Sequence, residues 1–128
     1  MQKPQALRRP KNLNLFTIRL PINAVISIMH RMSGMVLFLI QPFLLWALTV
    51  SLSGQDGYIA LSELMQHWTI KLVLLALSWA FFHHFYAGLR HLAMDVHWMT
   101  SLQKARLSSR LVLILVALSV AILSIVIW

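Results

Sequence analysis

The residues of this chain best suited to chemistry are imidazoles within an apolar stretch. Residues 79–95 read WAFFHHFYAGLRHLAMD. A continuous helix puts His84 on the same face as Gly88 and His91, which follow it by four and seven residues. Asp95, four residues beyond His91, extends that face. The face offers imidazole nitrogens that can ligate an iron and a carboxylate that can carry protons.

The adjacent imidazoles of His83 and His84 cannot both serve one ligand, because neighbouring helix positions are turned by about 100°. His84 is the stronger candidate, since Gly88 lies one turn away and leaves a gap in which a flat group such as a haem would fit. An ionisable group in apolar surroundings is costly unless it is coordinated or hydrogen-bonded. A lone histidine of this kind more often bonds a neighbouring helix, so that alternative stays open for each.

A second set of polar residues occurs in AVISIMHRMSGM, residues 24–35. On a helix Ser27, His30, Arg31 and Gly34 share one face. The planar guanidinium of Arg31 would suit a haem propionate or a quinone carbonyl, with the Ser27 hydroxyl as a small donor one turn away. Alternatively Arg31 anchors the helix at the membrane surface, and Ser27 is a contact between helices.

The elements that must position these residues follow from composition. The chain has 128 residues, of which 59% are hydrophobic and 11% charged, whereas a soluble domain has about a quarter charged. A span needs about 20 apolar residues. We therefore predict an all-α membrane protein, with an N-terminal segment 1–23 and a three-helix anchor 24–128. The predicted spans lie near residues 24–52, 65–92 and 107–128, the third being long enough only if residues 104–109 join its first turn.

Basic residues predict the orientation of these spans. Ten of the eleven gather before the first span and around the second connection: Lys3, Arg8, Arg9, Lys11, Arg19, Arg31, Arg90, Lys104, Arg106 and Arg110. Lys71, near the outer end of the second predicted span, is the one exception to the pattern, and its long side chain can reach the membrane surface. The first connection, 54–66, has no Lys or Arg, and Asp56–Gly57 predicts a turn there. The positive-inside rule then places the N-terminus and the second connection in the cytoplasm and the C-terminus in the periplasm. Arg90 would mark the cytoplasmic edge, and the net charge of +8 reflects topology rather than nucleic-acid binding.

The chain contains no cysteine, so it can hold no disulfide and no cysteine-ligated iron–sulfur cluster. It also has no glycine-rich phosphate loop, no paired carboxylates and no Ser-His-Asp arrangement. We therefore expect no catalytic residue in this chain and a binding role within a larger assembly.

Two motifs resemble those of a known family. SIMHRMSG (27–34) resembles the signature S-I-x-H-R-x-[ST]-G, and HHFYAGLRHLAMD (83–95) contains H-x-x-x-G-x-R-H-x-x-x-D. Both are signatures of the cytochrome b membrane-anchor subunit of succinate dehydrogenase, and the three-helix layout agrees over nearly the whole chain. RRPKNLNLFTIRLPINA (8–24) resembles the bacterial N-terminal segment, without the S-P-H triplet of many members.

The resemblance implies roles for particular residues. His84 matches an axial ligand of a b-type haem whose other axial histidine comes from a second small three-helix subunit. Ser27 and Arg31 match residues that line the quinone site beside an iron–sulfur subunit. His30, Arg31 and His91 match positions near the haem propionates. Asp95 matches an acidic residue associated with the quinone and its protons.

The same resemblance implies a subunit of succinate:quinone oxidoreductase in the bacterial inner membrane. It would anchor a flavoprotein and an iron–sulfur subunit on the cytoplasmic face, with ubiquinone or menaquinone as the electron acceptor. Two other functions remain open from the residues alone. One is a haem-free structural anchor for a soluble enzyme, and the other is a small transporter subunit.

Overall fold

The computed structural model describes residues 18–98 and 100–128, and over these ranges the regular elements are all helices. In chain order they are α1 (Ile22–Leu52), α2 (Gln55–Gln66), α3 (Trp68–Asp95) and α4 (Leu102–Ile127). Three of them, α1, α3 and α4, are long and apolar enough to cross a membrane. The all-helical class and the three candidate spans are confirmed. Most of the predicted 1–23 segment, residues 1–17, lies outside the described residues.

The first connection differs from the prediction, because it forms helix α2 rather than an open loop with a turn at Asp56–Gly57. The reversal of direction occurs earlier, at Gly54, whose φ of 134° favours glycine. Asp56 then lies in the first turn of α2, where its negative charge is stabilised by the helix dipole. A Cβ at Gly57 would clash with the Val50 carbonyl oxygen, so this glycine serves a close approach to the end of α1.

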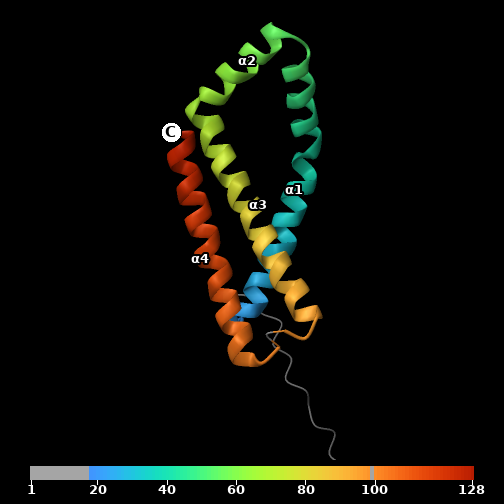
Figure 1. The fold of residues 1–128 in the computed structure, drawn as a ribbon, viewed down its shortest axis with the longest axis vertical. Coiled ribbons are helices and arrows are strands. Elements are labelled where there is room, and N and C mark those ends of the chain that lie inside the picture. The colour runs from blue at the N-terminus through green and yellow to red at the C-terminus, as the bar shows by residue number, and fades with distance from the viewer. Residues whose placement is uncertain (1–17, 99) are drawn as a thin grey trace, which may run out of the picture.

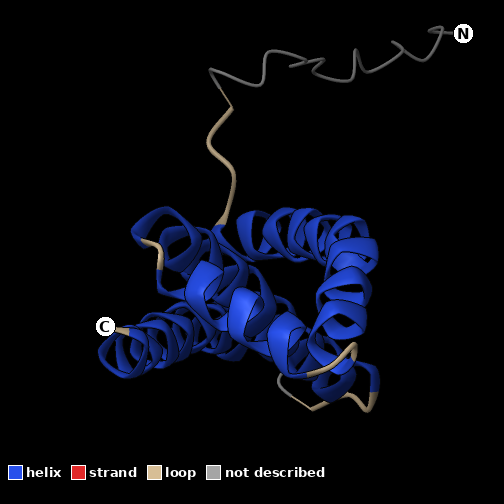
Figure 2. Cartoon of the chain, turned by 90° about the horizontal axis from the view of Figure 1, so that it is seen from above, coloured by secondary structure: helices blue, strands red, loops and turns tan. Residues whose placement is uncertain are grey.

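The start of α1, the end of α3 and the start of α4 lie together at one end of the molecule. Figure 1 shows that the start of α1 and the connection between α3 and α4 lie at the lower end, whereas α2 and the C-terminus lie at the upper end. Helix α3 packs against both α1 and α4. In the same view α1 and α3 separate toward the upper end, where α2 joins them, and Figure 2 shows the helices from above.

The packed core is small. It consists of Ile26, Ala87, Val112 and Val116, with Ile22, Phe82, Tyr86 and Val120 packed around it. Hydrogen bonds also join the helices, as between the hydroxyls of Tyr86 and Ser119 at 2.9 Å. Many large apolar side chains point outward instead, as expected for helices whose surroundings are hydrocarbon or other membrane subunits.

The end of α3 and the start of α4 are both capped. His97 adopts a φ of 60°, its N–H bonds the Met94 carbonyl at 2.9 Å, and the Trp98 N–H bonds the Ala93 carbonyl at 3.0 Å. These two bonds satisfy carbonyls that a helix end otherwise leaves free. Helix α3 therefore reaches Asp95, as the predicted face requires. Residues 104–109 lie within α4, which meets the length condition on the third span.

Candidate functional site

Three of the predicted site residues form a row of stacked imidazoles between α1 and α3. The His30 ring stacks on the His84 ring, with centroids 4.2 Å apart and planes 13° apart. The His30 ring also stacks on the His91 ring, with centroids 5.0 Å apart and planes 29° apart. All three side chains are half-buried, so part of each remains accessible from outside the chain. The structure thus joins the two polar faces that the sequence predicted separately.

The His84 ring is oriented by a backbone bond across the helix interface. Its Nδ1 lies 3.1 Å from the carbonyl oxygen of His30. A carbonyl only accepts, so Nδ1 carries the proton and Nε2 keeps its lone pair. Metal-ligating histidines commonly donate their second ring N–H in this manner. Within the described part of the chain Nε2 has no hydrogen-bond partner, so this nitrogen is available to an iron.

The donor set fits a haem better than a bare metal ion. Among residues 18–98 and 100–128 no group of three or more His, Cys, Asp or Glu side chains could hold a metal ion. A haem iron takes four ligands from its porphyrin and needs only axial nitrogens from protein. The His84 imidazole, with its Nδ1 bonded to the His30 carbonyl, could supply one such nitrogen through Nε2.

Gly34, on α1, makes room for the His84 ring. A Cβ on Gly34 would lie 2.7 Å from Cε1 and 3.0 Å from Nδ1 of His84, so a side chain there would displace the imidazole. A Cβ on Gly88 would lie 3.6 Å from Nε2 of His30, an ordinary contact. The gap at Gly88 therefore borders His30, and the close fit around His84 depends on Gly34. Sequence spacing showed both glycines but not which ring each one faces.

Arg31 and Ser27 lie one turn apart beside this row. Arg31 is exposed, and its Nε donates to the Ser27 carbonyl oxygen at 3.3 Å. The terminal nitrogens of the guanidinium have no partner in the described part of the chain. Ser27 is half-buried. This pair can therefore present a planar cation and a hydroxyl to a molecule outside the chain.

Asp95 occupies the last turn of α3 and is exposed. It forms no ion pair with any described residue. Its carboxylate continues the His84–His91 face toward the end of the helix, where water is accessible.

His83 lies in different surroundings from His84. It is fully buried, and neither ring nitrogen has a hydrogen-bond partner among the described residues. Its ring stacks on Trp79, with centroids 5.3 Å apart. The two adjacent histidines therefore point to different sides of α3, and only His84 reaches a surface.

Arg90, which the sequence predicts to mark the cytoplasmic edge of the second span, is buried within the chain. Its side chain is only 8% exposed. It donates to the Ser108 hydroxyl at 3.0 Å and to the Ala105 carbonyl at 3.4 Å, both on α4. Arg90 thus packs into the α3–α4 interface. The sequence could not show this, because it does not indicate which face of α3 is covered by α4.

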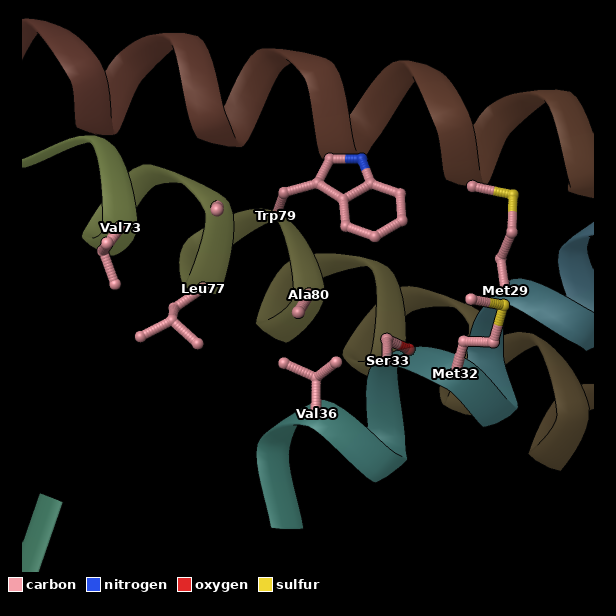
Figure 3. A pocket seen from close by; sticks show the side chains of 9 residues that line it. Met29, Met32, Ser33, Val36, Val73, Leu77, Trp79 and Ala80 are labelled. Atoms are coloured by element: carbon pink, nitrogen blue, oxygen red, sulfur yellow. The ribbon is translucent and has the colours of Figure 1, made fainter. Parts of the chain in front are cut away.

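Figure 3 shows a separate cavity between α1 and α3, of about 380 Å³. Its lining is almost entirely apolar: Met29, Met32, Ser33, Val36, Val73, Ala76, Leu77, Trp79 and Ala80. The one hydroxyl, that of Ser33, already donates to the His30 carbonyl at 2.9 Å. The cavity therefore offers mainly space for hydrocarbon.

Comparisons with known proteins show which family this chain resembles over most of its length. Residues 5–123 match the family described as Succinate dehydrogenase/Fumarate reductase transmembrane subunit. The chain is 34% identical over 123 residues to the succinate dehydrogenase cytochrome b556 subunit of Coxiella burnetii, covering 94% of this chain and 98% of that protein. It is 32% identical over 101 residues to the subunit of the same name from Rickettsia felis, covering 79% and 78% of the two chains. The Paracoccus denitrificans subunit of that name is 28% identical over 120 residues, covering 94% and 92%.

Proposed function

This chain belongs to the succinate dehydrogenase/fumarate reductase transmembrane subunit family, as a cytochrome b membrane anchor, and from that premise we propose a specific role for it. It binds haem b through His84, shares that haem with a second small membrane-anchor subunit and forms part of a quinone-reduction site. The observation that carries the proposal is the His84 imidazole, fixed by its Nδ1 bond to His30 with Nε2 left free.

The arrangement of the rings supports a role for a partner subunit. The His30 ring stacks on the face of the His84 ring, and His91 stacks on His30 in turn. Both rings are therefore occupied in this row, and a haem held by His84 would take its second protein ligand from a histidine of the second small anchor subunit.

The remaining site residues hold and orient groups around this position. When bound, haem b supplies a one-electron redox centre. His30, His91 and the Arg31 guanidinium offer donors to its propionates, and the Arg31 fork matches a carboxylate in two parallel bonds.

The quinone site uses Ser27, Arg31 and Asp95. Ser27 and Arg31 donate hydrogen bonds to a quinone carbonyl, which ubiquinone and menaquinone both possess. Quinone reduction consumes two protons as well as two electrons, and the exposed Asp95 carboxylate connects this end of α3 to water. The chain has no cysteine and so holds no cysteine-ligated iron–sulfur cluster. In this proposal the electrons come from a separate iron–sulfur subunit that a flavoprotein reduces.

Charge supports an orientation in the bacterial inner membrane. Ten of the eleven basic residues precede or open α1 or lie around the α3–α4 connection, and Lys71, near the start of α3, is the exception. The acidic Asp56 and Glu63 lie in α2 at the other end. We place the first end, with the N-terminal segment 1–23, in the cytoplasm and the C-terminus in the periplasm. The soluble subunits then bind on the cytoplasmic side, next to Ser27 and Arg31, while the anchor 24–128 lies in lipid.

Co-expression tests the proposal against a haem-free structural anchor. We expect this chain alone to retain little haem, because half of the axial ligation is missing. Together with a second small anchor subunit and the soluble subunits it should give the visible spectrum of a six-coordinate b-type haem. An assembled, succinate-oxidising complex without that spectrum would favour the structural anchor. Transport is disfavoured because the site side chains gather toward one end of the helices.

The fit around His84 gives a second test. Gly34→Ala should push the imidazole away from α1, at a cost of about 1–3 kcal/mol for overpacking, and so reduce haem retention. Gly88→Ala, which makes only an ordinary contact with His30, is the matched control. Haem content per assembled complex, measured from the reduced spectrum, separates them. Equal losses in the two variants would contradict the role given to Gly34.

A further inference from the structure

The side of α3 opposite the imidazole row carries a groove that the proposed function does not use. Two adjoining hollows, of about 190 Å³ and 260 Å³, lie between α3 and α4 where α3 ends and α4 begins. They share Trp98, Ser108 and Leu111 and so form one surface. We define the α3–α4 groove by Arg90, Trp98, Lys104, Ser108, Leu111 and Leu115.

Arg90 brings a buried positive charge to this groove without an anion to match it. Its recorded partners are neutral, the Ser108 hydroxyl and the Ala105 carbonyl. The chain has only three acidic side chains. Two of these lie in α2 at the far end of the molecule, and the third, Asp95, is exposed and makes no ion pair in the described part of the chain. A buried charge is stable only when it is paired, so the anion must come from outside this chain.

The rest of the groove fits hydrocarbon. From Arg90 and Lys104 it continues along α4 past Leu111 to Leu115, in the direction of two membrane-spanning helices. Trp98 stands at the polar end, held there by the cap of α3. Indole rings favour the level of lipid headgroups. The groove thus has a cationic end at the membrane surface and an apolar body within the membrane.

We propose that the α3–α4 groove binds an anionic phospholipid. Its phosphate pairs with Arg90 and Lys104, and an acyl chain lies along Leu111 and Leu115. The imidazole row faces α1, whereas this groove faces α4, so the inference stands or falls independently of the haem and quinone proposals.

Lipid retention by the assembled complex tests this site. The complex, depleted of lipid in detergent, is reconstituted in nanodiscs of equal phosphatidylglycerol and phosphatidylcholine and extracted again, and the retained lipids are counted by native mass spectrometry. We expect phosphatidylglycerol to be retained preferentially. Arg90→Gln should lower its retention about fivefold or more, the order expected for one cation at an anionic surface. Phosphatidylcholine retention should not change.

Two further variants keep the test decisive. Arg110, on α4, is also a cation but lines another hollow. The complex with Arg110→Gln should therefore retain phosphatidylglycerol normally. Leu111→Trp fills the groove and keeps the charge of Arg90, so it should lower retention even if the Arg90 variant fails to assemble. Equal retention of the two lipids, or an equal loss in the Arg110 variant, would overturn the proposal. A benzophenone crosslinker on Leu115→Cys that captures a subunit instead of lipid would assign the groove to a protein partner.

Discussion

Replacing His84 with alanine should remove the b-type haem from the assembled complex, or convert it to a form with an altered spectrum. The substitution deletes the one imidazole nitrogen that is both free and oriented by a bond to α1. Loss of a residue that merely supports a metal ligand costs about 10- to 100-fold in metal affinity, so loss of the ligand itself should cost more. The measurement is the reduced-minus-oxidised absorption spectrum, normalised to the flavoprotein in the same membranes.

The adjacent His83 provides a matched control. Its ring is enclosed and unpartnered within the described residues, so His83→Leu removes an imidazole without opening a large cavity. A near-normal haem spectrum is expected, with unchanged or higher stability, because an unbonded polar group is costly to bury. If the His83 variant lost the haem while the His84 variant kept a low-spin spectrum, the assignment of the axial ligand would be reversed.

The second large effect concerns quinone reduction. Ser27→Ala and Arg31→Leu should strongly depress electron transfer from succinate to quinone. Losing a hydrogen bond to a charged donor costs about 1.5–3 kcal/mol, or roughly 10- to 150-fold in affinity or rate. Arg31→Lys should recover only part of the activity, since a point charge does not replace a planar fork. Arg31 is exposed and Ser27 is half-buried, and neither belongs to the core cluster of the described residues, so we expect both variants to fold.

Two activities measured on the same membranes distinguish a quinone site from a role in assembly. Succinate oxidation with an artificial acceptor bypasses the membrane site and should be largely retained in the Ser27 and Arg31 variants. Arg106→Leu, which removes a cation from α4 outside the proposed site, should leave both activities near normal. A parallel fall of the two activities, normalised to assembled flavoprotein, would show that Ser27 and Arg31 serve assembly instead.

Sequence alone was sufficient for the properties that one helix carries by itself. Long uncharged runs identified the three candidate spans, because crossing hydrocarbon requires a minimum apolar length. The spacing of His84, His91 and Asp95 gave a common face, because helix geometry fixes the direction of each side chain from its position. Helix α3 reaches Asp95, so that face exists as predicted. The assignment of ligand and quinone roles on it remains a prediction.

Tertiary structure decided the properties that depend on how two helices meet. The sequence contained both Gly34 and Gly88, but only the register of α1 against α3 shows that the His84 ring lies on Gly34. The sequence placed Arg90 near the end of its span, but only the packing of α4 shows that its side chain is buried against Ser108. Periodicity defines the direction of a side chain relative to its own helix axis only. The rotation and offset between helices arise from the fit of many side chains at once, so no local pattern could place these residues.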